Sequence, residues 1–174
     1  MKNAIHTAIV AAAIVLAPVA SFAAQPFDDA TLTAKVKTAL IADPIAKAYE
    51  IDVDTKNGVV QLNGFVDSAK AREAAEHAAK TVADVRQIDN NLEVRTGERS
   101  TKVVADDAVI TTKVKTALAA DDPGLAMDVN VDTNNGEVLL SGFVDNDADR
   151  ARAEKAATAI DGVRKVYNEL MVSR

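Results

Sequence analysis

Residues 57–67 read Asn-Gly-Val-Val-Gln-Leu-Asn-Gly-Phe-Val-Asp, and residues 135–145 read Asn-Gly-Glu-Val-Leu-Leu-Ser-Gly-Phe-Val-Asp. In each copy Asn-Gly predicts a tight hairpin turn, because both residues tolerate positive φ. The alternation of apolar and polar residues that follows predicts a strand with one buried face. The closing Asp predicts the start of a helix. Because the surrounding residues repeat at the same spacing without a gap, the pattern indicates tandem duplication of one small domain.

The same order of elements is predicted on both sides of this stretch. In the first copy, helical spacing predicts one helix over 28–43 and a second, alanine-rich helix over 68–82. Period-two alternation predicts strands over 51–54, 59–64 and 88–94. The last two strands are joined through a helix, so we expect them to pair in parallel or through a similar crossover.

The predicted fold class is α+β, with two tandem domains. Each domain is expected to run helix-strand-strand-helix-strand, with a three-stranded mixed sheet packed against two helices. We place the first domain at 27–95 and the second at 106–174. Residues 96–105 are polar and include Gly97 and Ser100, so we interpret them as a linker.

The N-terminus has the three-part form of a secretory signal peptide. Lys2 precedes ten apolar residues from Ala8 to Ala17, Pro18 ends the run, and Ser21-Phe22-Ala23 offers small residues for cleavage after Ala23. A membrane anchor is the alternative, but such a run rises only about 15 Å as a helix, half of a hydrocarbon core. We expect residues 1–23 to be removed and the product to reach the periplasm of a cell with two membranes.

Charge and composition exclude several classes of protein. Without residues 1–23 the chain carries 19 basic and 26 acidic groups, a net charge of −7. Such acidity repels nucleic-acid phosphates, so no nucleic-acid partner is expected. The chain has no Cys, which excludes disulfides, thiolate nucleophiles, Cys-based zinc sites and a lipoprotein anchor. No later stretch is apolar for long enough to span a membrane, so we do not expect an integral membrane protein.

No set of residues predicts catalysis, a metal or a cofactor. His77 is the only histidine after residue 23, and its counterpart in the second copy is Lys155. We therefore expect His77 to be an exposed polar residue, with no base available to a serine nucleophile. The residues Asp52-x-Asp54-x-x-Asn57-Gly58 loosely resemble a calcium loop. A hairpin turn accounts for the same residue types, and no distal bidentate Glu follows.

Two other pairs of polar residues recur in the repeat. Asp67 and Asp145 each precede a predicted helix, and we interpret them, Asp67 as a pair with Ser68, as helix caps rather than as general acids or bases. Asn90 and Asn168 lie at inward positions of the last strands. We expect their amides to satisfy backbone groups at the sheet edge; the alternative is a polar feature of a binding surface.

The repeated residues resemble the BON domain family. The resemblance rests on Gly-Phe-Val-Asp at 64–67 and 142–145, on the alanine-rich helix after it, and on Gly-Val-Arg-x-Val-x-Asn-x-Leu at 162–170. The first copy departs from this pattern, because Asp84 stands where the second copy has Gly162. Asp tolerates positive φ less readily than Gly, so that turn is expected to be less favourable in the first copy.

Two such domains behind a signal peptide resemble the hyperosmotically inducible periplasmic members of that family. The resemblance implies a non-enzymatic protein of osmotic and envelope stress. It would act as a binding module at envelope phospholipid or protein surfaces, or alternatively as a periplasmic chaperone for exported or outer-membrane client proteins. The candidate contact residues are the lysines of the two first helices, which a solvated helix face would also explain: Lys35, Lys37, Lys113 and Lys115.

Overall fold

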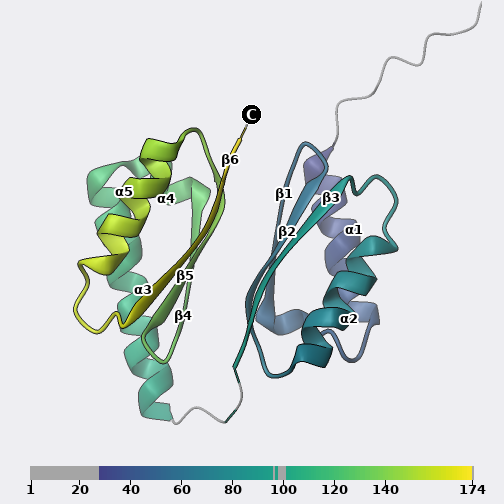
Figure 1. Cartoon of the computed structure of the whole chain (residues 1–174), viewed down its shortest axis with the longest axis horizontal. Helices are drawn as coiled ribbons and strands as arrows, with labels where there is room; N and C mark the ends of the chain where they lie inside the picture. Colours follow the sequence, from purple (N-terminus) through teal and green to yellow (C-terminus); the bar gives the residue numbers. More distant parts are fainter. Residues whose placement is uncertain (1–27, 96, 98–100, 174) are drawn as a thin grey trace, which may run out of the picture.

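Two domains of the same fold follow one another along the chain (Figure 1). The computed structural model describes residues 28–95, 97 and 101–173. The predicted signal peptide and its cleavage after Ala23 lie outside the described residues. Within the described ranges, no helix combines the length and apolarity that crossing a membrane requires.

The first domain contains two helices, one short 3-10 turn and three strands. In chain order these are α1 (Asp29–Ala42), η1 (Ala48–Glu50), β1 (Ile51–Lys56), β2 (Val59–Val66), α2 (Ala69–Lys80) and β3 (Gln87–Val94).

The second domain repeats this order, with a short helix in place of the 3-10 turn. Its elements are α3 (Thr101–Asp121), α4 (Pro123–Asp128), β4 (Val129–Asn134), β5 (Glu137–Val144), α5 (Asp147–Thr158) and β6 (Lys165–Val172). Helix α3 begins at Thr101, so residues 101–105 of the predicted linker are helical.

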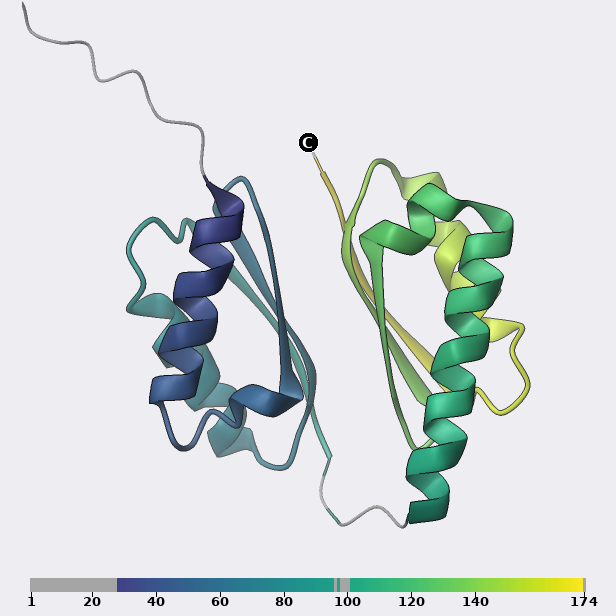
Figure 2. The same ribbon diagram turned by 180° about the vertical axis from the view of Figure 1, so that it is seen from behind.

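Each domain has one three-stranded mixed sheet, which confirms the predicted fold class. Strand β1 pairs antiparallel with β2, and β2 pairs in parallel with β3. The second sheet has the same pairing in β4, β5 and β6. The helices of each domain cover one face of its sheet, and the other faces of the two sheets turn toward each other (Figures 1 and 2).

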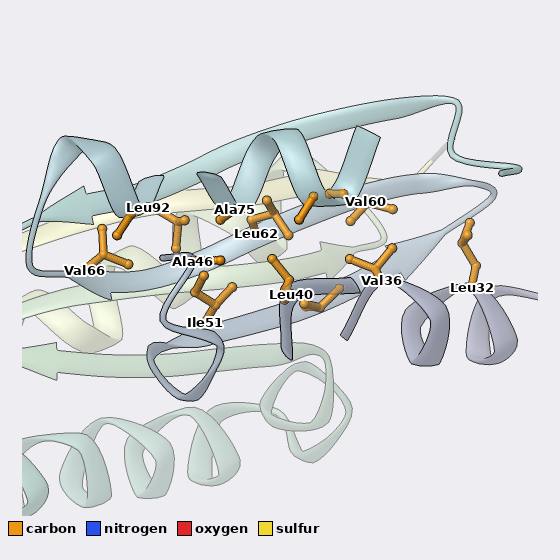
Figure 3. Close-up of a cluster of buried hydrophobic side chains, with 14 residues drawn as sticks. Leu32, Val36, Leu40, Ala46, Ile51, Val60, Leu62, Val66, Ala75 and Leu92 are labelled. Atoms are coloured by element: carbon orange, nitrogen blue, oxygen red, sulfur yellow. The ribbon is translucent and has the colours of Figure 1, made fainter. Parts of the chain in front are cut away.

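The core of each domain lies between its sheet and its helices. In the first domain, Leu32, Val36 and Leu40 of α1 point toward Val60 and Leu62 of β2 (Figure 3). These residues follow the helical stripe and the strand alternation that the sequence predicts. Full burial of each leucine side chain contributes about 2 kcal/mol. Matching residues of the second domain form an equivalent core.

A close backbone contact explains the second glycine of the repeated stretch. Gly64 has φ +131° and pairs with Ile51 at the start of β1. A Cβ atom at this position would collide with the carbonyl oxygen of Glu50. Gly142 repeats this geometry against the carbonyl oxygen of Asp128. The neighbour in each domain is thus the backbone of the preceding turn.

The N-caps of α2 and α5 are the residues that follow the two aspartates, and for α2 this is Ser68 of the predicted pair. Ser68 caps α2, because its Oγ accepts a hydrogen bond from the backbone N–H of Ala71 at 3.2 Å. Asn146 caps α5 in the same way, through the N–H of Asp149 at 2.9 Å. The assignment of Asp67 and Asp145 as caps was therefore wrong. The chain is still extended at the residue after each Asp, so the first free helix N–H groups lie beyond reach of the Asp side chain.

The turn at Asp84 keeps the geometry of its glycine counterpart. Asp84 has φ +76° and Gly162 has φ +98°, so both copies place a left-handed residue before the last strand. The departure from the family pattern therefore leaves the fold unchanged.

The outer faces of the two sheets meet in a largely polar interface. The Gln61 amide donates to the carbonyl oxygen of Glu169 at 3.0 Å and accepts from the N–H of Gly142 at 3.1 Å. Leu139 occupies the position of Gln61 in the second domain, and both side chains are fully buried. At one edge of the interface, Arg95 binds Glu137 and donates to the hydroxyl of Tyr167 at 2.6 Å.

Candidate functional site

The candidate lysines do not form one basic surface. Residues two apart on a helix are separated by about 200° around its axis. Lys35 and Lys37 therefore lie on opposite flanks of α1, and Lys113 and Lys115 on opposite flanks of α3. The Lys35 ammonium lies 3.5 Å from Oδ2 of Asp84, which neutralises it locally.

Lys37 and Lys115 lie on the flank that faces interdomain carboxylates. Burial raises the pKa of Asp54, and the charge of Lys37 partly offsets that rise. Burial and the negative charge of Asp52 raise the pKa of Asp132 to about 6, and Lys115 partly offsets this. These two lysines therefore balance charge within the protein itself.

Lys113 has a different environment, in a hollow of about 450 Å³ beside the first half of α3. Val103, Val109 and Ile110 line it from the same helix, and Arg164 lines it from the turn before β6. Val109 is 53% exposed. The hollow therefore combines two cations with an apolar wall that is open to solvent.

The acidic residues around this hollow have separate roles. The buried carboxylate of Asp107 accepts hydrogen bonds from the N–H groups of Asn135 and Gly136, at 2.9 and 2.8 Å. Asp106 and Asp161 also line the hollow, so its two cations, Lys113 and Arg164, share the lining with three carboxylates.

The repeat explains why Lys113 differs from Lys35. In the first domain the carboxylate of Asp84 binds Lys35. The second domain has Gly162 at the matching position and its carboxylate one residue earlier, at Asp161, so the ion pair of Lys35 with Asp84 is not repeated between Lys113 and residue 162. The sequence shows this difference, but its effect on the pairing of the lysine emerges only once the turn is seen to pack against the helix.

Asp29 and Asp107 form a matched structural contact that the sequence pattern did not predict. The carboxylate of Asp29 accepts hydrogen bonds from the N–H groups of Asn57 and Gly58, at 2.8 and 3.0 Å. Asp107 makes the same contacts with the Asn-Gly turn of the second domain. Each first helix is thereby fixed to the hairpin of its own domain.

Several large apolar side chains are exposed at the start of each sheet. Tyr49 is 79% exposed and Met127 is 88% exposed, and the two occupy matching positions in the repeat. Ile41, at the end of α1, is 75% exposed. These side chains contribute little to either core and are available for contact with a partner.

The remaining polar candidates have structural roles. The Asn90 amide donates to the carbonyl oxygen of Arg72 at 3.2 Å and to Glu76 at 3.1 Å, and Asn168 makes the matching contacts in the second domain. The expectation that these amides satisfy backbone groups is confirmed. His77 is exposed on α2. Across 28–95, 97 and 101–173, no three His, Asp or Glu side chains form a group that could hold a metal ion.

Comparisons with known proteins agree with the duplicated architecture. The model of the BON domain family matches residues 28–96 and 106–174. The chain is 43% identical to osmotically-inducible protein Y of Escherichia coli (strain K12) over 144 residues, 82% of this chain and 72% of that protein. It is 36% identical to outer membrane lipoprotein DolP of Haemophilus influenzae over 140 residues, 80% of this chain and 72% of that protein.

Among solved structures, the C-terminal domain of CdsD, a structural protein of the type III secretion system of Chlamydia trachomatis, is similar. The alignment covers 85% of this chain and 100% of that domain, with 16% identity and a TM-score of 0.34. Both halves of the chain match the family model, and the relatives named above align across both halves. The chain therefore belongs to the BON domain family, as two domains in tandem.

Proposed function

We propose that this protein is a non-enzymatic periplasmic protein of the response to hyperosmotic and envelope stress, and that it binds the surface of anionic phospholipid. The proposed periplasmic location is supported by the signal-peptide pattern of residues 1–23. The names of two relatives, one osmotically inducible and one an outer membrane lipoprotein, support the link to osmotic stress and to the envelope.

The hollow beside α3 is the main observation that supports binding to anionic phospholipid. Lys113 and Arg164 would contact lipid phosphates there, because guanidinium and ammonium groups both form charge-assisted hydrogen bonds with phosphate oxygens. Val103 and Val109 would contact the less polar region beneath the headgroups. Each basic residue near an anionic surface contributes about 1 kcal/mol. Two such residues support reversible contact rather than stable anchoring.

The net charge sets the conditions under which this contact is measurable. A chain with a net charge of −7 is repelled by an anionic surface outside the contact itself. The attraction from Lys113 and Arg164 is screened over about 10 Å at 0.1 M salt. We therefore expect binding at low salt to vesicles of phosphatidylglycerol and phosphatidylcholine, and little binding to phosphatidylcholine alone.

Replacing Lys113 with Glu should lower the vesicle partition coefficient by about thirtyfold, because two units of charge change where each contributes about 1 kcal/mol. Lys35→Glu is the matched control, since it makes the same change of net charge at the same position of the repeat. Lys35 is already ion-paired with Asp84, so we expect its reversal to change binding by less than about threefold. Co-sedimentation measures both variants. Equal losses for the two would show that net charge, and not the hollow, governs binding.

A second function, that of a periplasmic chaperone for exported client proteins, is favoured by the exposed apolar side chains. Tyr49, Met127 and Ile41 offer apolar contacts to an unfolded segment. If this is their role, a Tyr49→Ser, Met127→Ser variant should lose most of the protein's ability to suppress aggregation of an unfolded outer-membrane protein at near-equal concentration. Light scattering measures the effect. Full retention by the variant, or inertness of the unaltered protein, would count against this function.

A further inference from the structure

The two domains face each other about an approximate two-fold axis. Two hollows between the domains are built from the same positions of the repeat, with the domains exchanged. One, of about 410 Å³, includes Tyr49, Asp52 and Phe65 of the first domain and Asp132 of the second. The other, of about 280 Å³, includes Met127, Asn130 and Phe143 of the second domain and Asp54 of the first.

This approximate symmetry relates two contacts between strands β1 and β4. In one, the Asn130 amide lies 2.9 Å from both carboxylate oxygens of Asp54. In the other, Asp52 stands in the position of Asn130 and Asp132 in the position of Asp54. The amide donor of the first contact is thus replaced by a second carboxyl group.

The chemistry of the two contacts differs in one respect. The side-chain amide of Asn130 donates a hydrogen bond to the carboxylate of Asp54 without any change of protonation. Two carboxyl groups can share a hydrogen bond only when one carries a proton, and Asp52 and Asp132 line the same hollow between the domains. We propose that Asp52 and Asp132 form a proton-dependent latch that holds the two domains together and weakens when both carboxyl groups are ionised.

The charged groups around the latch favour the protonated pair. Asp54 adds further negative charge from β1, while Lys115 of α3 opposes it. Glu50 and Asp67 line the same hollow, as does Arg95, whose guanidinium is bound to Glu93 and Glu137. Burial is the largest cause that raises the pKa of Asp132, and the negative charge of Asp52 is the next largest. Together they raise this pKa to about 6.

The direction of the pH dependence follows from this shift. With the domains apart, we expect the pKa of Asp132 to return toward its ordinary value of 3.8, so the closed form binds more protons. The latch then contributes fully below pH 3.8, loses strength as pH rises, and contributes nothing above about pH 6. We expect the closed-to-open equilibrium constant to be about tenfold larger at pH 5 than at pH 8.

The test measures the distance between the domains as a function of pH. The chain has no Cys, so Glu73→Cys on α2 and Ala151→Cys on α5, both exposed positions, accept one spin label each. Double electron–electron resonance on the full chain should show the short-distance population falling between pH 5 and pH 8. Circular dichroism at both pH values would verify that each domain stays folded.

Two variants exchange the chemistry of the matched contacts. Asp52→Asn supplies the amide found in the other contact and removes the charge of Asp52 that raises the pKa of Asp132, so its closed population should fall less between pH 5 and pH 8 than that of the unaltered chain. Asn130→Asp creates a second carboxyl pair and should make the pH dependence steeper than in the unaltered chain. A pH-independent distance in the unaltered chain, or an unchanged pH dependence in Asp52→Asn, would overturn the proposal. If either variant failed to fold, the other and a carboxyl-carbon NMR titration of Asp132 would still decide it.

Discussion

Replacing Gly64 with Ala should lower the free energy of unfolding of the first domain by about 3 kcal/mol or more. The new Cβ would collide with the backbone carbonyl oxygen of Glu50, and φ at this position is +131°. Neither neighbour can move without breaking the pairing of β1 with β2. Because a domain of this size is stable by only about 5 kcal/mol, we expect a large unfolded population. Urea denaturation of the full chain, followed by circular dichroism, measures the loss.

Gly97→Ala is the control for this experiment. Gly97 also has positive φ, at +107°, but nothing lies within 4 Å of the position of its Cβ. Its replacement therefore measures the cost of the backbone conformation alone, about 1 kcal/mol. If Gly64→Ala cost no more than Gly97→Ala, the close approach of the two strands would not be the reason for the glycine.

Replacing Asp107 with Ala should lower the free energy of unfolding of the second domain by about 3 kcal/mol. The variant loses two charge-assisted hydrogen bonds and leaves the N–H groups of Asn135 and Gly136 without the acceptor they have now. Asp107 is only 4% exposed, so water would replace the carboxylate poorly. Thermal and urea denaturation both measure the effect.

Two further variants separate this contact from a general effect of removing charge. Asp107→Asn keeps one acceptor oxygen and should recover about half of the loss. Asp29→Ala removes the matching contact in the first domain at a more exposed position, so we expect a smaller cost. An Asp29→Ala loss equal to that of Asp107→Ala would show that burial does not control the strength of this contact.

Most elements of the fold follow from short-range patterns, and the helices and strands predicted from these patterns are present in the structure. Val36 and Leu40 lie on the buried stripe of α1, and Val60 and Leu62 on the buried face of β2, as their periodicity indicates. The six-residue helix α4 was not predicted. Pro123 is its first residue and Asp122 is its N-cap. The same two residue types are also typical of a turn, so the sequence did not distinguish the two structures.

The contacts between elements were harder to predict from the sequence. Asp29 and Asp107 precede their Asn-Gly turns by the same number of residues, and that constant spacing was the available signal. It was missed because an acidic residue at the start of a helix already has a local explanation. Likewise, the exchange of Asp84 for Gly162 was interpreted as a change of backbone geometry. Its effect on Lys35 and Lys113 requires the packing of the turn against the helix.

The sequence patterns did not predict the interface between the two domains. Strand alternation shows which face of a sheet packs on its own helices, but not whether another domain covers the second face. Gln61 and Leu139 are at matching positions on that second face, and both are fully buried. Apolar residues at outward positions, Leu139 and the matched pair Phe65 and Phe143, were the available signs of the contact.

We propose that the hollow beside α3 contacts phospholipid. A photoreactive amino acid in place of Val109, on the wall of this hollow, would test it in living cells. The same probe in place of Thr31, the matching position of the first domain, is the control. We predict that the Val109 probe captures phospholipid under hyperosmotic conditions and that the Thr31 probe captures much less. Capture of exported proteins without lipid at Val109 would contradict the claim and favour the chaperone function.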